Sequence, residues 1–340
     1  MRIKQTKLEK FIEEKKPKYS QDWPAYNMAQ TSETRIMIQL LYDLMNQINF
    51  KSVKRKGHPF LYAPDLLFCC SLKLYFQLPA RRLISILKMA KELGYIQKVP
   101  HFNTILNYLK RKELTPILKE LLTLSSLPLK EVERKFAVDA TGFSTNQYNQ
   151  WIKAKGKVSK WKSFVKAHAM CGVFTNVITS LEITSGYVHN MTQFPALVSK
   201  TADYFRMDEV LADKGYTSKL NLAIVRQFGA IPYIPFKSNV NPKGRGSYIW
   251  KKCLALFKDK PEEFYRHYHL RSNAESTFSM IKRKFGAKLF TRNIVSQTNE
   301  LYLKCICHNI SVLIHSIFEL GLEIDLNKCA REIPAQQLTI

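Results

Sequence analysis

The chain has 340 residues, of which 46% are hydrophobic, enough to bury one large core or the cores of two domains. Its 53 lysines and arginines against 27 acidic residues give a net charge of +26, which is typical of proteins that bind nucleic-acid phosphates. We expect no membrane partner and no secretory signal, because no run of about 18 apolar residues and no apolar N-terminal centre is present.

The cysteines favour reduced thiols. There are seven of them, an odd number, and no two are spaced as Cys-x-x-Cys. Such usage indicates a cytoplasmic protein rather than a disulfide framework or a zinc site.

Residues 1–30 are polar and basic, and we interpret them as an arm that lies on DNA or on a partner subunit; a solvated terminus gives the same pattern. A helical pattern begins behind a predicted cap at Thr31 and Ser32. Ile36, Leu40 and further apolar residues then recur every four positions.

Further helices are predicted over 64–77, 79–94 and 103–114, the last capped by Asn103 and stopped before Pro116. Its outward face carries amide and basic side chains: Asn103, Asn107, Lys110 and Arg111. We interpret residues 31–127 as a DNA-binding domain resembling a helix-turn-helix. A helical bundle with a basic solvated face is the alternative.

After residue 127 the pattern changes to short strands. The expected order is three strands, a helix, a strand, a helix, a strand and a helix, followed by a long apolar helix near 298–320. This order predicts an α/β fold for residues 128–340, a ribonuclease-H-like mixed five-stranded sheet with helices on both faces.

Residues 268–282, read as one helix, carry two adjoining stripes. The apolar stripe is predicted to be buried: Leu270, Ala274, Phe278, Ile281 and Phe285. The polar stripe beside it holds Tyr268, Arg271, Glu275 and Lys282. An exposed helix with one Arg–Glu pair at four-residue spacing is the plain alternative.

Two aspartates complete a candidate acidic site. Asp139 is expected to end the first strand and Asp213 the fourth, which are neighbours at the centre of such a sheet. Taken alone, each is an ordinary turn or capping residue. Together with Glu275 they predict an oxygen-only site for Mg²⁺ or Mn²⁺. Two such ions roughly 3.5–4 Å apart support in-line displacement at a phosphodiester.

The spacing Tyr268, Arg271, Glu275, Lys282, with VDATGF around Asp139 and LADKGYTSK around Asp213, resembles the signature of insertion-sequence DDE transposases, those of the groups numbered four and five. The segment KVPHFNTILNYLKR also resembles the block before their catalytic domain. The resemblance implies a metal-holding triad of Asp139, Asp213 and Glu275, and DNA contacts by Tyr268, Arg271 and Lys282.

The resemblance also implies a function. Such enzymes are prokaryotic, cytoplasmic and nucleoid-associated, and they work on double-stranded DNA as homodimers or larger assemblies. They bind the terminal inverted repeats of a mobile element, hydrolyse the strand at its ends with two divalent metal ions, and join the freed 3′-hydroxyl to target DNA.

One departure from the family concerns the space between the second aspartate and the glutamate. Many relatives of the group numbered four carry a large β insertion there, but Glu275 follows Asp213 by only 62 residues. We expect a basic loop over 237–260 with Tyr248 and Trp250 placed to stack on DNA, or else a solvated loop. Hairpin formation, which some relatives link to the insertion, is not implied. The basic segment 151–162, with its two tryptophans, is a second candidate backbone contact.

Two other classes of protein fit parts of the pattern. A ribonuclease-H-like nuclease or resolvase shares the acidic site, but not the transposase-like helices before it. A catalytically inactive DNA-binding protein derived from a transposase has no need of all the acids.

Overall fold

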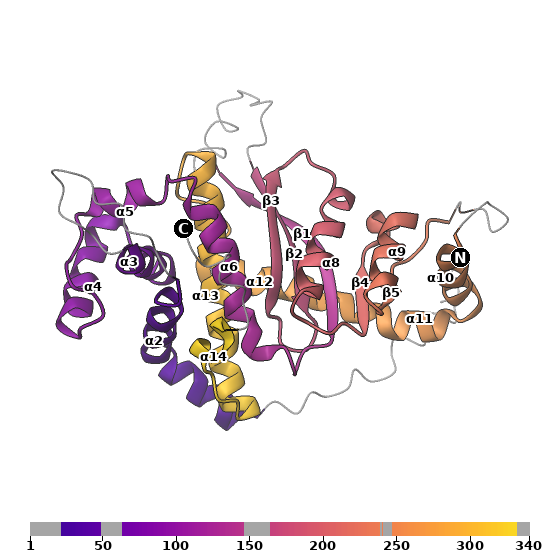
Figure 1. Cartoon of the computed structure of the whole chain (residues 1–340), viewed down its shortest axis with the longest axis horizontal. Helices are drawn as coiled ribbons and strands as arrows, with labels where there is room; N and C mark the ends of the chain where they lie inside the picture. Colours follow the sequence, from indigo (N-terminus) through magenta and orange to yellow (C-terminus); the bar gives the residue numbers. More distant parts are fainter. Residues whose placement is uncertain (1–21, 49–62, 146–163, 239, 241–246, 332–340) are drawn as a thin grey trace, which may run out of the picture.

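The computed structural model describes residues 22–48, 63–145, 164–238, 240 and 247–331. Most of the predicted arm, the whole basic segment 151–162 and part of the predicted basic loop lie outside the described residues. A helical layer occupies one side of the molecule and the sheet the other (Figure 1). One continuous hydrophobic core runs through both.

The helical layer precedes the sheet in the chain. Its helices are α2 (Trp23–Met45), α3 (Ala63–Tyr75), α4 (Ala80–Glu92), α5 (Phe102–Tyr108) and α6 (Leu114–Ser126). The start predicted at Thr31 is wrong, because Asp22 caps α2 by accepting from the backbone amide of Ala25 at 3.0 Å. Pro116 does not end a helix either. It lies in the first turn of α6, where its missing N–H removes no helical hydrogen bond.

The sheet has the order β3-β2-β1-β4-β5. Its strands are β1 (Lys135–Ser144), β2 (Phe164–Gly172), β3 (Ile178–Ser185), β4 (Glu209–Ala212) and β5 (Ile231–Tyr233). The first three are antiparallel, while β4 and β5 run parallel to β1 and to each other. This mixed five-stranded sheet confirms the ribonuclease-H-like fold expected from the order of elements.

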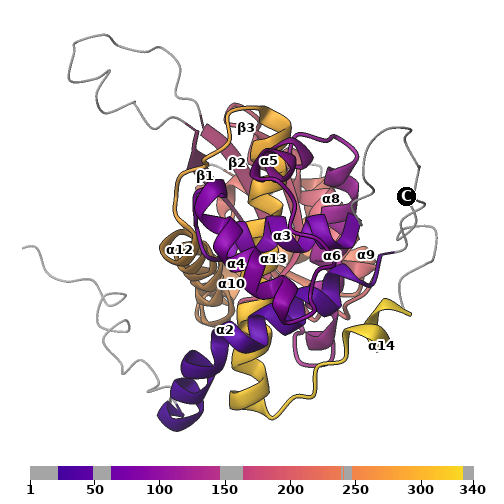
Figure 2. The same ribbon diagram turned by 90° about the vertical axis from the view of Figure 1, so that its left-hand side faces the viewer.

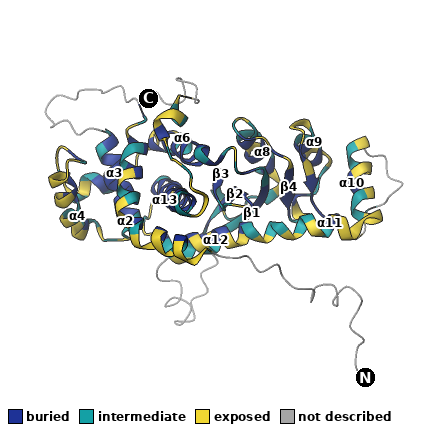
Figure 3. Cartoon of the chain, turned by 90° about the horizontal axis from the view of Figure 1, so that it is seen from below, coloured by how far each residue is buried: buried dark blue, intermediate teal, exposed yellow. Residues whose placement is uncertain are grey.

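Helices cover both faces of the sheet. The helices of the second half are α8 (Phe194–Ala202), α9 (Lys219–Gln227), α10 (Tyr248–Asp259), α11 (Pro261–Tyr268), α12 (Ser272–Phe285), α13 (Ile294–Leu320) and α14 (Leu326–Ala330). Figure 3 shows α8 and α9 on one face and α11 and α12 on the other. The predicted basic loop 237–260 is therefore wrong in its second half, where α10 begins behind a cap at Ser247.

The long helix α13 joins the two sides of the molecule. It packs against α2, α3 and α6 and also contacts β2 and β3 (Figure 2). By length and composition it passes as a membrane span, but 83% of its most apolar window is buried inside the protein. Its apolar surface is therefore used by the core.

A candidate acidic site beside the sheet

The two aspartates are placed side by side by strand register. The parallel pairing of β1 and β4 ends at Val138 opposite Ala212, so Asp139 and Asp213 are the next residues on the two chains. The expectation that Asp139 ends its strand is wrong, since β1 continues to Ser144 along β2 after its pairing with β4 has ended. The site thus opens where β4 leaves β1.

Each aspartate has one oxygen fixed by a backbone amide. Asp139 Oδ1 accepts from the amide of Ala140 at 2.8 Å, and Asp213 Oδ1 accepts from the amide of Lys214 at 2.7 Å, at the start of the 3-10 turn Lys214–Tyr216. These bonds orient the carboxylates, and each second oxygen remains to meet other groups.

Arg271 lies between two of the three acids. Its Nη2 is 2.5 Å from Glu275 Oε1, and its Nη1 is 3.5 Å from Asp139 Oδ2. The side chain of Arg271 is only 19% exposed, so this charge is held at the site rather than in bulk solvent. The guanidinium is therefore the positive charge that the described residues place among the carboxylates.

The carboxylates influence one another. Burial raises the pKa of Asp139, the charges of Glu275 and Asp213 raise it further, and the Ala140 amide and Arg271 oppose the rise. Carboxylates that lie this near to one another repel, and the single charge of Arg271 offsets only part of that repulsion. The three acids thus belong to one electrostatic site.

Glu275 is the most open member of the site. Its side chain is 58% exposed, against 19% for Asp139. The sequence analysis took residues 268–282 as one helix, but the 3-10 turn His269–Arg271 separates α11 from α12. Glu275 consequently falls in the first turn of α12, where the helix dipole favours a negative charge.

The stripe of α12 that was predicted to be buried is buried. Ala274, Phe278, Ile281 and Phe285 are each at most 4% exposed, and Leu270 is partly buried. On the polar stripe, Tyr268 has its ring 5.9 Å from the Arg271 guanidinium. Lys282 lies further along α12, where its Nζ contacts Thr141 Oγ1 of β1. Burial lowers the pKa of Lys282.

Tyr216 was missed by sequence reasoning, although it lies in the quoted segment LADKGYTSK. It is 1% exposed, and its hydroxyl has no hydrogen-bond partner among the residues that the structure describes. Burial and the charges of Asp139 and Asp213 raise its pKa, so it remains a neutral phenol. An unpartnered phenol beside two carboxylates marks a polar site with unused hydrogen-bonding capacity.

A second missed set of residues holds α12 against the hairpin turn between β2 and β3. Asn273 Nδ2 donates to Val173 O at 2.7 Å, and Thr277 Oγ1 donates to Asn176 Oδ1 at 3.1 Å. The turn is itself braced by Glu133, which is 1% exposed and accepts from the backbone amides that follow Val173. Only the three-dimensional arrangement brings these segments together.

The acids fit a divalent cation by their chemistry. They offer carboxylate oxygens without sulfur or nitrogen, as Mg²⁺ and Mn²⁺ prefer, and the unpartnered phenol of Tyr216 adds a polar wall. Within the described ranges, no group of three His, Cys, Asp or Glu side chains is arranged to hold a metal ion. The carboxylate of Glu275 is paired with Arg271 in this structure.

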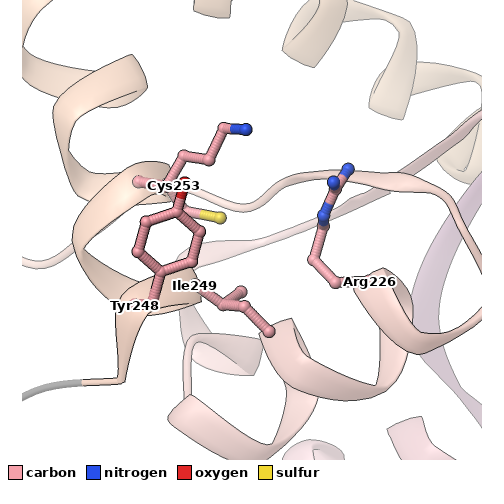
Figure 4. Close-up of a pocket in the computed structure, with 5 residues that line it drawn as sticks. Arg226, Tyr248, Ile249 and Cys253 are labelled. Carbon is pink, nitrogen blue, oxygen red and sulfur yellow. The ribbon is translucent and has the colours of Figure 1, made fainter.

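A separate basic pocket of about 240 Å³ lies on α9 and α10 (Figure 4). It is lined by Arg226, Tyr248, Ile249, Lys252 and Cys253. Tyr248 is 77% exposed, and the Arg226 guanidinium is tied back by a 3.3 Å bond to Ala230 O. The pocket shares no residue with the acidic site.

Residues 130–310 match the model of a protein family described as the transposase DDE domain. No curated protein matches the chain in sequence. A solved structure that is similar is the piggyBac transposase synaptic complex with hairpin DNA, determined by cryo-EM. The identity is 10%, the TM-score is 0.46, and the match covers 86% of this chain and 78% of that one.

Proposed function

The chain belongs to the transposase DDE domain family, and we propose that it is a DNA transposase of an insertion sequence, of the groups numbered four and five. It binds the element's terminal inverted repeats, hydrolyses a phosphodiester at each end and joins the freed 3′-hydroxyl to target DNA. The observation that carries this proposal is the register of β1 and β4, which sets Asp139 beside Asp213, with Glu275 electrostatically coupled to Asp139.

Asp139, Asp213 and Glu275 are the residues that would hold divalent metal ions, Mg²⁺ or Mn²⁺. The family generally uses such ions, and a pair of them supplies activation of the attacking oxygen and stabilisation of the leaving one. The chain's own contribution is to fix one oxygen of each aspartate by a backbone amide, so that the carboxylates are already oriented.

Arg271 is the residue that we propose to grip the phosphate next to the cleaved bond. A guanidinium suits two parallel bonds to phosphate, and this one already lies at the acids. In the DNA-free protein its charge offsets the repulsion between the carboxylates. When it turns to the phosphate, Glu275 is released toward the aspartates. Tyr268, stacked beside Arg271, and Lys282 provide further DNA contacts.

We propose that residues 31–127 bind the element's ends. Asn103, Asn107, Lys110 and Arg111 are all exposed, as expected of a surface that meets DNA. The exposed Arg81 crosses from α4 to lie 5.0 Å from the Phe102 ring of α5, so these two helices present basic groups together. The pocket of Arg226, Lys252 and Tyr248 is a second basic surface for the duplex.

The proposed setting follows from the same activity. The protein acts on double-stranded DNA in a prokaryotic cytoplasm, in association with the nucleoid, and a homodimer bridges the two ends of the element. The net charge of +26 supports the DNA partner.

A cleavage assay tests the function. Purified protein is mixed with Mg²⁺ or Mn²⁺ and a labelled duplex taken from the DNA that flanks the gene, and nicking and strand joining are followed on a gel. We expect cleavage by the wild type and none by Asp213→Asn, with similar DNA affinity for both. Binding without any cleavage would instead identify the inactive DNA-binding protein, which the outward Glu275 also fits. Cleavage of any duplex without joining would identify a nuclease.

A further inference from the structure

The far end of α12 is tied to the N-terminal helical layer. Lys284, in the last turn of α12, has its Nζ 2.5 Å from Glu33 Oε2 of α2 and 2.9 Å from Ser311 Oγ of α13. The Glu33 side chain is 11% exposed and the Lys284 side chain 33%, so the ion pair is partly shielded from bulk solvent. Figure 3 shows α11 and α12 along one side of the molecule, with α2 beyond the end of α12.

Two further contacts reinforce this tie. The Tyr75 hydroxyl at the end of α3 donates to Glu33 Oε1 at 2.8 Å. Gln77, two residues later, donates from its side-chain amide to the backbone carbonyl of Lys284. Gln77 has a positive φ of 53°, a backbone conformation that is uncommon for residues other than glycine. This turn of the backbone places the side-chain amide of Gln77 next to α12. We name the set of Glu33, Tyr75, Gln77 and Lys284 the α12 clasp.

The same helix, α12, carries a residue of the α12 clasp and a residue of the acidic site. Glu275 and Lys284 are nine residues apart, which is about 13 Å along a helix and half a turn around it. One side of the first turn of α12 therefore faces Asp139, through Arg271, and the opposite side of its last turn faces α2 and α3. A shift of α2 and α3 against the sheet moves the helix that carries Glu275.

From this geometry we propose that the α12 clasp is a positioning device: it couples DNA binding by the N-terminal helices to the placement of Glu275 at the aspartates. The proposal rests on the proposed function, because it takes the N-terminal helices as the DNA-end binding region. Lys284 acts here as a positioning residue that touches neither the substrate nor the reacting atoms. The clasp makes cleavage depend on an occupied N-terminal region.

The test compares Lys284→Met with a matched control. Lys119→Met breaks another ion pair between the helical layer and the sheet, Lys119 Nζ to Glu182 Oε1 at 2.8 Å, which does not involve α12. The substrate is the duplex that flanks the gene, at saturating protein. We expect Lys284→Met to slow single-turnover cleavage by about 10-fold or more, since a misplacement on the order of 1 Å costs up to roughly 10²-fold. Its DNA affinity should stay within about twofold of the wild type.

Rescue and non-additivity separate positioning from mere stability. Lys284→Arg keeps the charge and should recover most of the rate, and Glu33→Gln combined with Lys284→Met should be no slower than Lys284→Met alone. Equal loss in Lys119→Met and Lys284→Met would overturn the proposal, as would an unchanged rate. A fall in DNA affinity instead of rate would make Lys284 a DNA contact.

Hydrogen exchange gives a readout that does not depend on cleavage. Adding the duplex should increase amide protection over residues 272–285 in the wild type and in Lys119→Met, but not in Lys284→Met. If the wild type binds the duplex and the variants respond alike, the coupling is absent. If the wild type neither binds nor cleaves the duplex, the proposed function is wrong. The role of the clasp in positioning α12 is then tested in the free protein, where Lys284→Met, but not Lys119→Met, should increase hydrogen exchange over residues 272–285.

Discussion

The two ends of α12 are built in opposite ways. At its first turn, Glu275 is 58% exposed and shares one guanidinium with Asp139. Beyond its last turn, Lys304 and Glu300 of α13 are 0% and 2% exposed, and together they bind the segment that follows the helix. Lys304 donates to Gly286 O and Lys288 O, and Glu300 accepts from the Phe290 amide. One end has spare hydrogen-bonding capacity and the other has none.

This difference indicates what each end is for. A buried ion pair with every bond made fixes position and is intolerant of change. An exposed carboxylate that repels its neighbours lowers stability but is free to accept a cation or to move. The helix is anchored at its C-terminal end and open at the end that carries Glu275.

The largest expected effect comes from removing the carboxylate at the open end of α12. Glu275→Gln should abolish cleavage. The loss of rate should be well above the roughly 10–100-fold that follows from changing a residue that only supports a metal ligand. Folding and DNA affinity should be nearly those of the wild type, because the side chain is mostly exposed. Cleavage of the flanking duplex and a binding titration are the measurements. Glu262→Gln, at the start of α11, is the control, and loss of folding in Glu275→Gln would make this glutamate structural.

At the anchored end the expected loss is in stability. Lys304→Met leaves Glu300 buried without its cation and should lower the free energy of unfolding by about 3–5 kcal/mol. Denaturant titration measures it. Adding Glu300→Gln should recover part of the loss, whereas Lys260→Met at the exposed pair with Glu263 should change stability by at most about 1 kcal/mol. A small effect of Lys304→Met would show that this end is not an anchor.

The free energy of unfolding should fall in acid because of a buried histidine near the middle of α12. His308 Nε2 lies 2.9 Å from Asn176 O, in the turn that holds Thr277, and burial lowers the pKa of His308 to about 4. As pH falls, the imidazole is protonated in the unfolded chain before it is protonated in the folded protein. The free energy of unfolding is therefore at its full value above pH 6.5, the pKa of an unfolded histidine, and decreases by up to roughly 3 kcal/mol as pH falls toward 4. Unfolding free energies at pH 7 and 4.5 test this.

The control for that prediction removes a different imidazole. His308→Gln keeps a donor for Asn176 O and should reduce the dependence on pH between 6.5 and 4. Part of the dependence should remain, because burial also lowers the pKa of His168 to about 4. His189→Gln, at an exposed position before α8, should leave the dependence as in the wild type. An unchanged slope in His308→Gln would assign the acid sensitivity to another group.

The smallest expected effect concerns Lys282, which lies in the last turn of α12 and contacts β1. Lys282→Ala should weaken DNA binding and reduce the slope of log affinity against log salt by about one, if the side chain leaves Thr141 to meet one phosphate. Binding titrations at several salt concentrations measure the slope. An unchanged slope would place Lys282 with the anchoring contacts rather than with the DNA contacts.

Much of the fold was predictable because it depends on near neighbours in the chain. The predicted order of strands and helices matches the five strands among the described residues and the helices between them, and the spacing of Ala274, Phe278 and Ile281 identified the buried stripe of α12. Errors occurred where one local signal was given too much weight. Thr31 resembles a cap but lies inside α2, and the basic composition near Tyr248 concealed the start of α10.

The residues of the candidate site were predictable from the sequence, but the arrangement of their side chains was not. Sequence alone identified the two aspartates and the helical glutamate, although it wrongly placed Asp139 at the end of its strand, and the register of β1 with β4 brings the aspartates together. It gave no sign that Arg271 would be shared between Asp139 and Glu275, or that Tyr216 would be buried beside them without a partner. Those features depend on side-chain conformations, which the surroundings of each residue determine.

The sequence by itself determined the order of elements, the acids and the faces of α12, because strand and helix periodicities are local properties of the backbone. Only the tertiary structure decided that Lys284 binds Glu33 and that Lys304 holds the end of α12. A hydrogen bond between distant segments forms when packing brings two groups within about 3 Å, and no local pattern encodes that distance.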